Sequence, residues 1–380
     1  MVFISLLRSK MKVLITGANG FVAKNLTQYL LEKENIEILK LFRDSSEQEL
    51  EQLVKSADWI VHLAGVNRPQ TDAEFLEGNV SLTEKICNIL SRLNKKTPII
   101  LSSSIQAEAS NIYGQSKLGA EQVILKLNQE NANPIYISRF VNIFGKWSRP
   151  NYNSAVATFC YNIANDLPIQ VNDENALIRL VYVDDVVDTI WDILNNKYPE
   201  NKTFEVQPEY QITVGKLAEV INGFKRSRES LITDHVGTGL VRALYSTYLS
   251  FLSPIQFDYA IPKYGDNRGI FVEMLKTPDT GQFSYFTAHP GITRGGHYHH
   301  TKTEKFLVMK GHALFKFKHV ITGEFYELKT SGEEPRIVET VPGWTHDITN
   351  IGDEEMLVML WANEIFDRSK PDTYAMSLTD

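Results

Sequence analysis

The stretch VLITGANGFVA at residues 13–23 decides the fold of the N-terminal part of this chain. Its apolar start, residues 13–16, is typical of a buried strand, and a helical pattern begins directly after Gly20. Glycines between a strand and a helix let the backbone approach a pyrophosphate at the helix N-terminus, although an isolated glycine pair also occurs in ordinary tight turns. In this context the stretch predicts a dinucleotide site with these cofactor-binding residues: Gly17, Asn19, Gly20, Phe21 and Val22.

Short apolar runs continue to alternate with longer amphipathic stretches as far as about residue 206. The further runs lie at residues 36–42, 59–63, 99–102 and 135–139. This rhythm predicts an α/β domain, a Rossmann-type doubly wound parallel sheet at residues 11–245. From residue 258 onward, many short strand-like runs are separated by Gly, Pro and Asp, which predicts an all-β jelly-roll barrel at residues 252–380. We expect the boundary near Ser250.

Composition excludes several classes of partner. The 380 residues carry 39 Lys and Arg against 46 Asp and Glu, a formal net charge of −7, and no basic run is present to bind nucleic acid. No apolar stretch is long enough to span a membrane. Cys87 and Cys160 are far apart, so we expect a cytoplasmic protein without disulfides. Residues 1–10 lack a signal-peptide pattern and are expected to be an extension ahead of the first strand.

The type of nicotinamide cofactor is indicated by Arg43 at the end of the second expected strand. An acidic residue there would bind a ribose 2'-hydroxyl, whereas an arginine would bind a 2'-phosphate, so NADPH is favoured over NADH. The alternative is a solvated surface arginine beside Asp44. Four residues at the third strand are expected to border the adenine and the nicotinamide ribose: Asp58, Leu63, Ala64 and Gly65.

A proton-transfer set is suggested by Tyr113 and Lys117, which are four residues apart and therefore lie on one face of a helix. An adjacent ammonium lowers the pKa of a tyrosine from its usual value of about 10 and makes proton exchange with a carbonyl oxygen workable near neutral pH. Ser104, after the run at 99–102, can hydrogen-bond the same oxygen. The spacing arises often by chance, so its combination with the glycine loop is what predicts the catalytic residues Ser104, Tyr113 and Lys117.

These motifs together resemble the extended short-chain dehydrogenase/reductase family over roughly residues 11–245. The resemblance rests on the GANGFVA loop, Ser102-Ser103-Ser104, Tyr113-x-x-x-Lys117, Arg139-Phe-x-Asn142 and Tyr182-Val-Asp184-Asp185. It implies NAD(P) binding, a Ser-Tyr-Lys triad whose Tyr113 and Lys117 also contact the cofactor, and nucleotide-sugar substrates. Two positions depart from the family: Ala23 stands at the third glycine position, and Arg179 is one place off the usual basic position.

Four potential metal ligands follow in the C-terminal part: His297, His299, Glu304 and His346. Alternate residues of a strand face one side, so His297 and His299 can point together, joined by the other two from neighbouring strands. Three imidazoles and one carboxylate suit Zn, Fe, Mn or Ni, and we expect Zn²⁺. The alternative is a histidine-rich strand held by hydrogen bonds. The spacing resembles the cupin signature, and Asp266-x-Arg268-Gly269 resembles the sugar-nucleotide epimerases among the cupins.

The whole chain is similar to the CapF-type bifunctional enzymes of capsular polysaccharide biosynthesis. Segments such as HLAGVNRP at 62–69 and HHTKTE at 299–304 carry this closer match. It implies that the cupin epimerises C3 of a UDP-4-keto-6-deoxy-N-acetylhexosamine and that the N-terminal domain reduces the C4 ketone with NADPH. The product would be UDP-N-acetyl-6-deoxy-L-talosamine, in the UDP-N-acetyl-L-fucosamine pathway for capsule or O-antigen.

Two alternatives to this function stay open. One is a rhamnose-type epimerase/4-ketoreductase acting on a dTDP or UDP sugar, and the other is a non-catalytic NADP-sensing regulator. Retention of Ser104, Tyr113 and Lys117 argues against the regulator, since a sensor needs no proton-transfer set. Edge strands that need covering favour a homodimer through the β domain.

Overall fold

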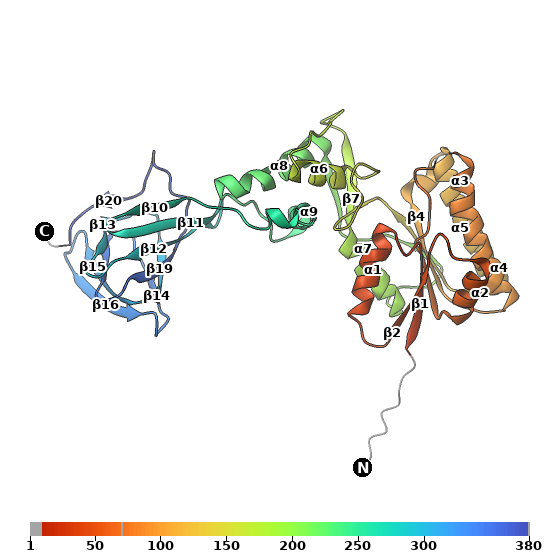
Figure 1. Cartoon of the computed structure of the whole chain (residues 1–380), viewed down its shortest axis with the longest axis horizontal. Coiled ribbons are helices and arrows are strands. Elements are labelled where there is room, and N and C mark those ends of the chain that lie inside the picture. The colour runs from red at the N-terminus through yellow and green to blue at the C-terminus, as the bar shows by residue number, and fades with distance from the viewer. Residues whose placement is uncertain (1–9, 70, 379–380) are drawn as a thin grey trace, which may run out of the picture. The chain divides into compact units, whose positions relative to one another are not determined.

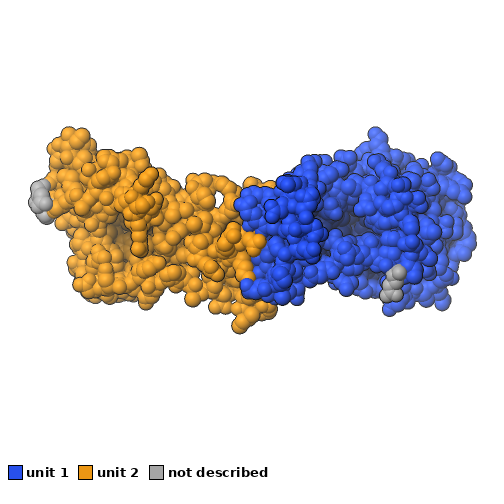
Figure 2. Space-filling model, turned by 90° about the horizontal axis from the view of Figure 1, so that it is seen from above, with its two compact units in different colours: residues 1–221, 243–252 blue, residues 222–242, 253–380 orange. Residues whose placement is uncertain are grey.

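The computed structural model of the chain describes residues 10–69 and 71–378, so the expectation for residues 1–10 falls outside it except at Lys10. The chain forms two compact units: unit 1, of residues 1–221 with 243–252, and unit 2, of residues 222–242 with 253–380 (Figure 2). The change in sequence pattern near residue 250 does not indicate that residues 222–242 belong to unit 2 while residues 243–252 return to unit 1. The domain limits 11–245 and 252–380 remain a proposal.

Unit 1 is built on a six-stranded parallel sheet in the order β2-β1-β3-β4-β5-β8. Its strands are β1 (Met11–Thr16), β2 (Ile36–Leu41), β3 (Trp59–His62), β4 (Ile99–Ser104), β5 (Ile135–Phe140) and β8 (Lys202–Phe204). A smaller sheet joins β6 (Asn142–Phe144), β7 (Leu177–Tyr182) and β9 (Glu209–Thr213). The prediction of a Rossmann-type parallel sheet is confirmed.

Helices cover both faces of the large sheet (Figure 1). The helices of this part of unit 1 are α1 (Phe21–Leu31), α2 (Glu47–Ser56), α3 (Ala73–Leu76), α4 (Leu82–Arg92), α5 (Ile112–Asn131), α6 (Ala155–Ala164) and α7 (Val183–Leu194), with the π-helix η1 (Glu77–Ser81) and the 3₁₀ helix η2 (Ile105–Glu108). Val13 and Ile15 of β1 pack against α1 and α7, and Leu14 packs on the opposite side against α2 and α4. Because both faces are buried, these strands read as continuous apolar runs.

Two helices follow the smaller sheet, α8 (Val214–Ser230) and α9 (Gly239–Leu249), before the 3₁₀ helix η3 (Pro254–Gln256). α8 extends to Ser230 through a polar last part. In that part Arg228 donates from Nη2 to the carbonyl of Gln256 at 2.5 Å, a tertiary contact that no apolar repeat announces. Among the described residues, no helix has both the length and the apolar character needed to cross a membrane.

Unit 2 consists mainly of two antiparallel sheets, in the orders β10-β11-β12-β19-β14-β17 and β16-β15-β18-β13-β20. The strands are β10 (Lys263–Asp266), β11 (Gly269–Thr277), β12 (Gly281–Ala288), β13 (Thr293–Tyr298), β14 (Glu304–Lys310), β15 (His312–His319), β16 (Phe325–Ser331), β17 (Ile337–Glu339), β18 (Trp344–Asn350), β19 (Met356–Ala362) and β20 (Tyr374–Ala375). Phe286, Phe306, Phe315 and Ile348 are among the residues of the buried core of these sheets. The predicted all-β C-terminal architecture is confirmed.

Candidate functional site

The glycine loop between β1 and α1 has the form expected of a phosphate-binding turn. Gly17 has φ +64°, and a Cβ added there would lie 2.8 Å from the Cα of Ala64, so no larger residue fits. Gly20 is the N-cap of α1, no side chain caps the helix, and its first turn carries no acidic residue. The N–H groups at this positive end of the helix dipole therefore face no competing protein anion and fit a pyrophosphate.

Ala23, at the third glycine position, is completely buried against the sheet. The contact between α1 and the sheet thus accommodates a methyl group. The departure from the glycine pattern leaves the helix in place, with Asn19, Phe21 and Val22 around its start.

The segment after β3, which holds Leu63, Ala64 and Gly65, lies against the glycine loop. The hydroxyl of Thr16, at the end of β1, accepts a hydrogen bond from the Ala64 N–H at 3.0 Å. A Cβ on Gly65 would meet Lys117 Nζ at 3.1 Å. These contacts bring the ends of β1 and β3 and the lysine of α5 together at one edge of the sheet.

A buried polar chain supports this segment. His62 lies between the hydroxyls of Thr16 and Thr83, at 2.7 and 2.9 Å. Burial lowers the pKa of His62 to about 3, with a smaller contribution from the Lys117 ammonium, so the imidazole is neutral at pH 7. Asn79 of the π-helix holds both the N–H and the carbonyl of Val66, at 2.9 and 3.0 Å.

Asp58 does not belong to this site, and its assignment to the adenine is corrected. It precedes β3 at the amino end of the strand, where its carboxylate accepts a hydrogen bond from the Lys12 N–H at 2.7 Å. The cofactor loop lies at the carboxyl end of the parallel strands. The position of Asp58 in the sequence, after a polar run, did not indicate which end of the strand this residue would occupy.

A hollow of about 430 Å³ opens beside the glycine loop, within unit 1. Its lining comes from the loop itself, from α1 and β2, and from Trp147; the residues are Ala18, Asn19, Lys24, Thr27, Gln28, Lys40, Phe42 and Trp147. Arg43 follows Phe42 directly and is exposed. Lys24 and Lys40 are two further cations at this edge that the sequence motifs did not single out.

The predicted catalytic residues come together at the ends of β4 and α5. Ser104 closes β4, and its hydroxyl lowers the pKa of the Tyr113 phenol. Lys117, one turn further along α5, is buried and donates from Nζ to the carbonyl of Ser102 at 3.0 Å. Burial raises the pKa of Tyr113, and the Ser104 hydroxyl offsets part of this rise. The net pKa of Tyr113 is therefore raised where the sequence predicted a lowered value, because the effect expected of Lys117 does not outweigh burial.

Lys117 itself is the more perturbed of the two groups. Burial lowers its pKa to about 8, although the Glu121 carboxylate acts in the opposite direction. Glu121 is buried and accepts hydrogen bonds from the Ser103 hydroxyl at 2.5 Å and from Nε and Nη2 of Arg139 at 2.9 and 2.7 Å. These contacts tie α5 to β4 and β5 and so fix the helix that carries Tyr113 and Lys117. Ser103 and Arg139 stood in sequence motifs, whereas Glu121 was missed.

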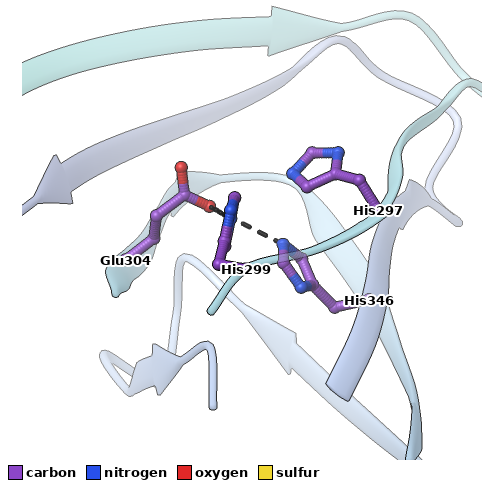
Figure 3. A group of neighbouring side chains, drawn as sticks. All are labelled: His297, His299, Glu304 and His346. Atoms are coloured by element: carbon purple, nitrogen blue, oxygen red, sulfur yellow. Dashed lines mark hydrogen bonds and ion pairs between the residues drawn. The ribbon is translucent and has the colours of Figure 1, made fainter. Parts of the chain in front are cut away.

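The four predicted metal ligands meet in unit 2 (Figure 3). His297 ends β13, His299 follows that strand, Glu304 begins β14 and His346 lies in β18. One donor atom from each lies within 4.8 Å of all the others. His299, Glu304 and His346 are buried, so the cluster is enclosed by protein.

The donor atoms of the four residues are arranged to ligate a cation and not to hydrogen-bond one another. The Nδ1 of His299 faces the carbonyl of Asp372 at 2.5 Å, and because a carbonyl only accepts, Nδ1 carries the proton. The bare Nε2 then faces Glu304 Oε2 at 3.4 Å, while His346 Nε2, 3.6 Å from the same oxygen, is buried without a hydrogen-bond partner. Ligands about 2.1 Å from a tetrahedral metal are about 3.4 Å apart, so the set fits Zn²⁺.

Charge in this cluster also suits a divalent cation. Burial lowers the pKa of His297 to about 4, and His346 adds to the effect, so His297 is neutral and free to ligate. Burial raises the pKa of Glu304, and the Lys302 ammonium acts in the opposite direction and favours the carboxylate. Lys302 Nζ lies 3.0 Å from Glu304 Oε1, which leaves Oε2 for the metal. Sequence reasoning missed Lys302.

Comparison with known proteins agrees with both units. The family described as "NAD dependent epimerase/dehydratase family" matches residues 13–206, and "Polysaccharide biosynthesis C-terminal domain" matches residues 264–374. The UDP-2-acetamido-2,6-beta-L-arabino-hexul-4-ose reductase of Pseudomonas aeruginosa is 57% identical over 368 residues, which are 97% of this chain and 99% of the relative.

Solved structures agree with the same assignment. The capsular polysaccharide assembling protein CapF from Staphylococcus aureus is 45% identical, with a TM-score of 0.89 over 97% of this chain and 100% of that one. The UDP-glucuronic acid 4-epimerase from Bacillus cereus in complex with NAD, 16% identical with a TM-score of 0.55 over 63% of this chain and 98% of that one, shares the fold alone. The chain therefore belongs to the NAD dependent epimerase/dehydratase family of nicotinamide-dependent enzymes, among the CapF-type sugar-nucleotide reductases and epimerases with a polysaccharide biosynthesis C-terminal domain.

Proposed function

We propose that unit 1 reduces the C4 ketone of a UDP-4-keto-6-deoxy-N-acetylhexosamine with NADPH and that unit 2, loaded with Zn²⁺, inverts C3 of the same sugar. The product is UDP-N-acetyl-6-deoxy-L-talosamine, made for the UDP-N-acetyl-L-fucosamine pathway of capsule or O-antigen. The observation that carries the proposal is the presence, on one chain, of Ser104 and Tyr113 beside buried Lys117 and of the four-ligand cluster. The 57% identical relative, named as a UDP-hexulose reductase, supports this substrate class.

In the reductive half, NADPH supplies the hydride when it is bound at the glycine loop. Tyr113 then delivers its phenolic proton to the oxygen of C4, and Ser104, whose hydroxyl acts on the Tyr113 phenol, orients that oxygen. The ammonium of Lys117 stabilises the tyrosinate that results, because it is buried at the same edge of the sheet and water screens it little. Arg43, with Lys24 and Lys40 nearby, provides positive charge for a 2'-phosphate.

In the epimerising half, the ketone at C4 makes the hydrogen on C3 acidic, so inversion has to precede reduction. His297, His299, Glu304 and His346 would hold the metal, which when bound supplies a Lewis acid that polarises the ketone. Lys302 keeps Glu304 ionised and oriented.

A homodimer through unit 2 is supported by its sheet edges. β16 is an edge strand of its sheet, and its side chains Phe325 and Tyr326 are 50% and 55% exposed. A second copy covering this edge would remove apolar surface and unpaired backbone groups from water.

The test uses purified full-length protein whose metal content has been measured by elemental analysis. NADPH absorbance is followed with the UDP-4-keto-6-deoxy-N-acetylhexosamine, and with a dTDP-4-keto-6-deoxyhexose as the competing sugar. NADPH consumption with the first sugar by zinc-containing protein supports the proposal. Two results would contradict the proposal. One is NADPH consumption with the dTDP sugar alone, and the other is tight NADPH binding with no NADPH oxidation in the presence of either sugar.

A further inference from the structure

The segment that follows β19, residues 363–376, contacts the chain beside every one of the four proposed metal ligands. Next to His297, the N–H of Met376 donates to the carbonyl of Gly296 at 3.0 Å, and Ala375 pairs with His297. Next to Glu304, Thr303 donates from its N–H to Asn363 Oδ1 at 2.9 Å. Next to His346, the Thr345 hydroxyl donates to the carbonyl of Met376 at 2.7 Å. The fourth ligand, His299, is contacted directly.

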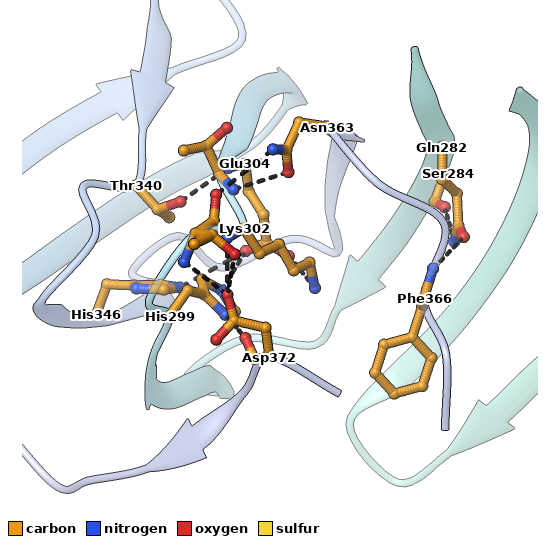
Figure 4. A network of polar contacts seen from close by, with 12 residues as sticks. Gln282, Ser284, His299, Lys302, Glu304, Thr340, His346, Asn363, Phe366 and Asp372 are labelled. Carbon is orange, nitrogen blue, oxygen red and sulfur yellow. Dashed lines mark hydrogen bonds and ion pairs between the residues drawn. The ribbon is translucent and has the colours of Figure 1, made fainter. Parts of the chain in front are cut away.

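Asp372 makes the contact with His299 and also binds the backbone that follows it (Figure 4). Its carbonyl accepts from His299 Nδ1, and its carboxylate accepts from the three consecutive N–H groups of residues 300–302, at 3.0, 2.7 and 2.8 Å. The hydroxyl of Thr301 adds a fourth donor at 3.0 Å. One residue therefore fixes both the imidazole of His299 and the backbone that follows it.

Both contacts act on the donor atoms of the cluster. Since the carbonyl of Asp372 can only accept, it keeps the proton on Nδ1 and leaves Nε2 bare toward Glu304. The turn held by the carboxylate ends at Lys302, whose ammonium occupies Glu304 Oε1 and lies over the ring of Phe366, in the same segment, at 5.6 Å. The tautomer of one ligand and the orientation of another thus both depend on the segment.

We propose that residues 363–376 form a strap that completes the metal site, and that Asp372 is its positioning residue. The strap contributes no ligand; it sets the ligands in the geometry that a cation requires. This inference rests on the proposed metal site. Outer partners of this kind typically change metal affinity by about 10- to 100-fold when they are removed.

The test measures Zn²⁺ affinity of the full chain by competition with a chromophoric chelator, after the resident metal has been stripped. Asp372→Asn keeps the size and the carbonyl but loses the charge. The matched control is Asp367→Asn in the same segment, because its carboxylate accepts from Ser369 and Lys370, which belong to the segment itself. We expect Kd to rise by about 10- to 100-fold for Asp372→Asn and to stay unchanged for Asp367→Asn. Equal affinity of Asp372→Asn and the unsubstituted chain would overturn the proposal.

A second measurement keeps the proposal testable if Asp372→Asn fails to fold. In the unsubstituted chain, amide hydrogen exchange at residues 300–302 and 374–376 is expected to slow on addition of Zn²⁺, because ligation and the strap stabilise each other. An amide exchange rate at these residues that does not change on addition of Zn²⁺ would contradict the proposal that the strap completes the metal site. An unsubstituted chain that binds no Zn²⁺ at all would instead overturn the proposed metal site.

Discussion

At the scale of single residues, Lys117 sets the pH range of the reductase. Its pKa is lowered to about 8 by burial, against the opposing effect of Glu121, so the ammonium needed beside the tyrosinate is present below about pH 8 and lost above it. His62, another titratable group near Lys117, is already neutral there. NADPH oxidation measured from about pH 6 to 10 should fall on the alkaline side with an apparent pKa near 8. A rate that stays flat to about pH 10 would contradict this role of Lys117.

His62 makes a separate prediction about stability. Its pKa is about 3 in the folded chain against an ordinary 6.5, so the unfolded chain binds more protons between these values. The stabilisation from this neutral imidazole is therefore fully present above about pH 6.5 and is lost as pH falls toward 3. Thermal unfolding at about pH 7 and 5 should show a larger loss for the unsubstituted chain than for His62→Gln, whose side chain has no proton to gain. Equal losses would contradict the buried-neutral assignment.

Residues with chemistry in a short motif were predictable, and residues that act through tertiary contacts were not. The spacing of Tyr113 and Lys117 follows from one helix, and His297 and His299 follow from one strand end. Asp372 lies 73 positions beyond His299, and only the folded chain brings them together. The error at Asp58 has the same origin, because a residue beside a strand carries no local sign of which sheet edge it will reach.

At the scale of elements, the π-helix Glu77–Ser81 is the one that positions the segment after β3. It presents Asn79, whose amide also donates to Ser116 of α5 at 2.9 Å, so the two elements are joined through one buried side chain. Asn79→Ala leaves the N–H and carbonyl of Val66 without these partners. We expect weaker NADPH binding and a loss of about 1–3 kcal/mol in the free energy of unfolding, measured by fluorescence titration and urea denaturation.

The control for this change is Asn172→Ala, an exposed asparagine of unit 1 whose side chain accepts only from Gln170. Asn172→Ala should change neither the NADPH affinity nor the free energy of unfolding. NADPH affinity of Asn79→Ala equal to that of the unsubstituted chain would show that the segment after β3 keeps its place without the π-helix.

Elements were predictable where burial imposes a pattern. The five predicted strands of unit 1, β1 to β5, lie in a sheet covered by helices and appear as apolar runs, so their positions agree closely with the predicted ones, whereas β6 to β9 were not predicted. β13 contains Gly295, Gly296 and His297 with a shift in register, and it offers no alternation to detect. β20 has only two residues and depends on pairing with β13.

At the scale of the whole molecule, the glycine loop belongs to unit 1 and the four-ligand cluster to unit 2. Removal of metal with a chelator should therefore stop exchange of the C3 hydrogen with solvent deuterium while leaving NADPH affinity unchanged. Readdition of Zn²⁺ should restore the exchange. Deuterium uptake by the stripped protein at the original rate, followed by mass spectrometry, would mean that the cluster has no part in epimerisation.

The most direct test of two separate chemistries on one chain is Tyr113→Phe, assayed for both reactions in the same sample. The substitution removes the proton donor but keeps the ring that packs against Phe75. NADPH oxidation should fall by about 10²- to 10⁴-fold, since that is the range of a general acid's contribution, while deuterium uptake at C3 continues at the unsubstituted rate. Loss of both reactions in a folded Tyr113→Phe protein that still binds Zn²⁺ would contradict the account.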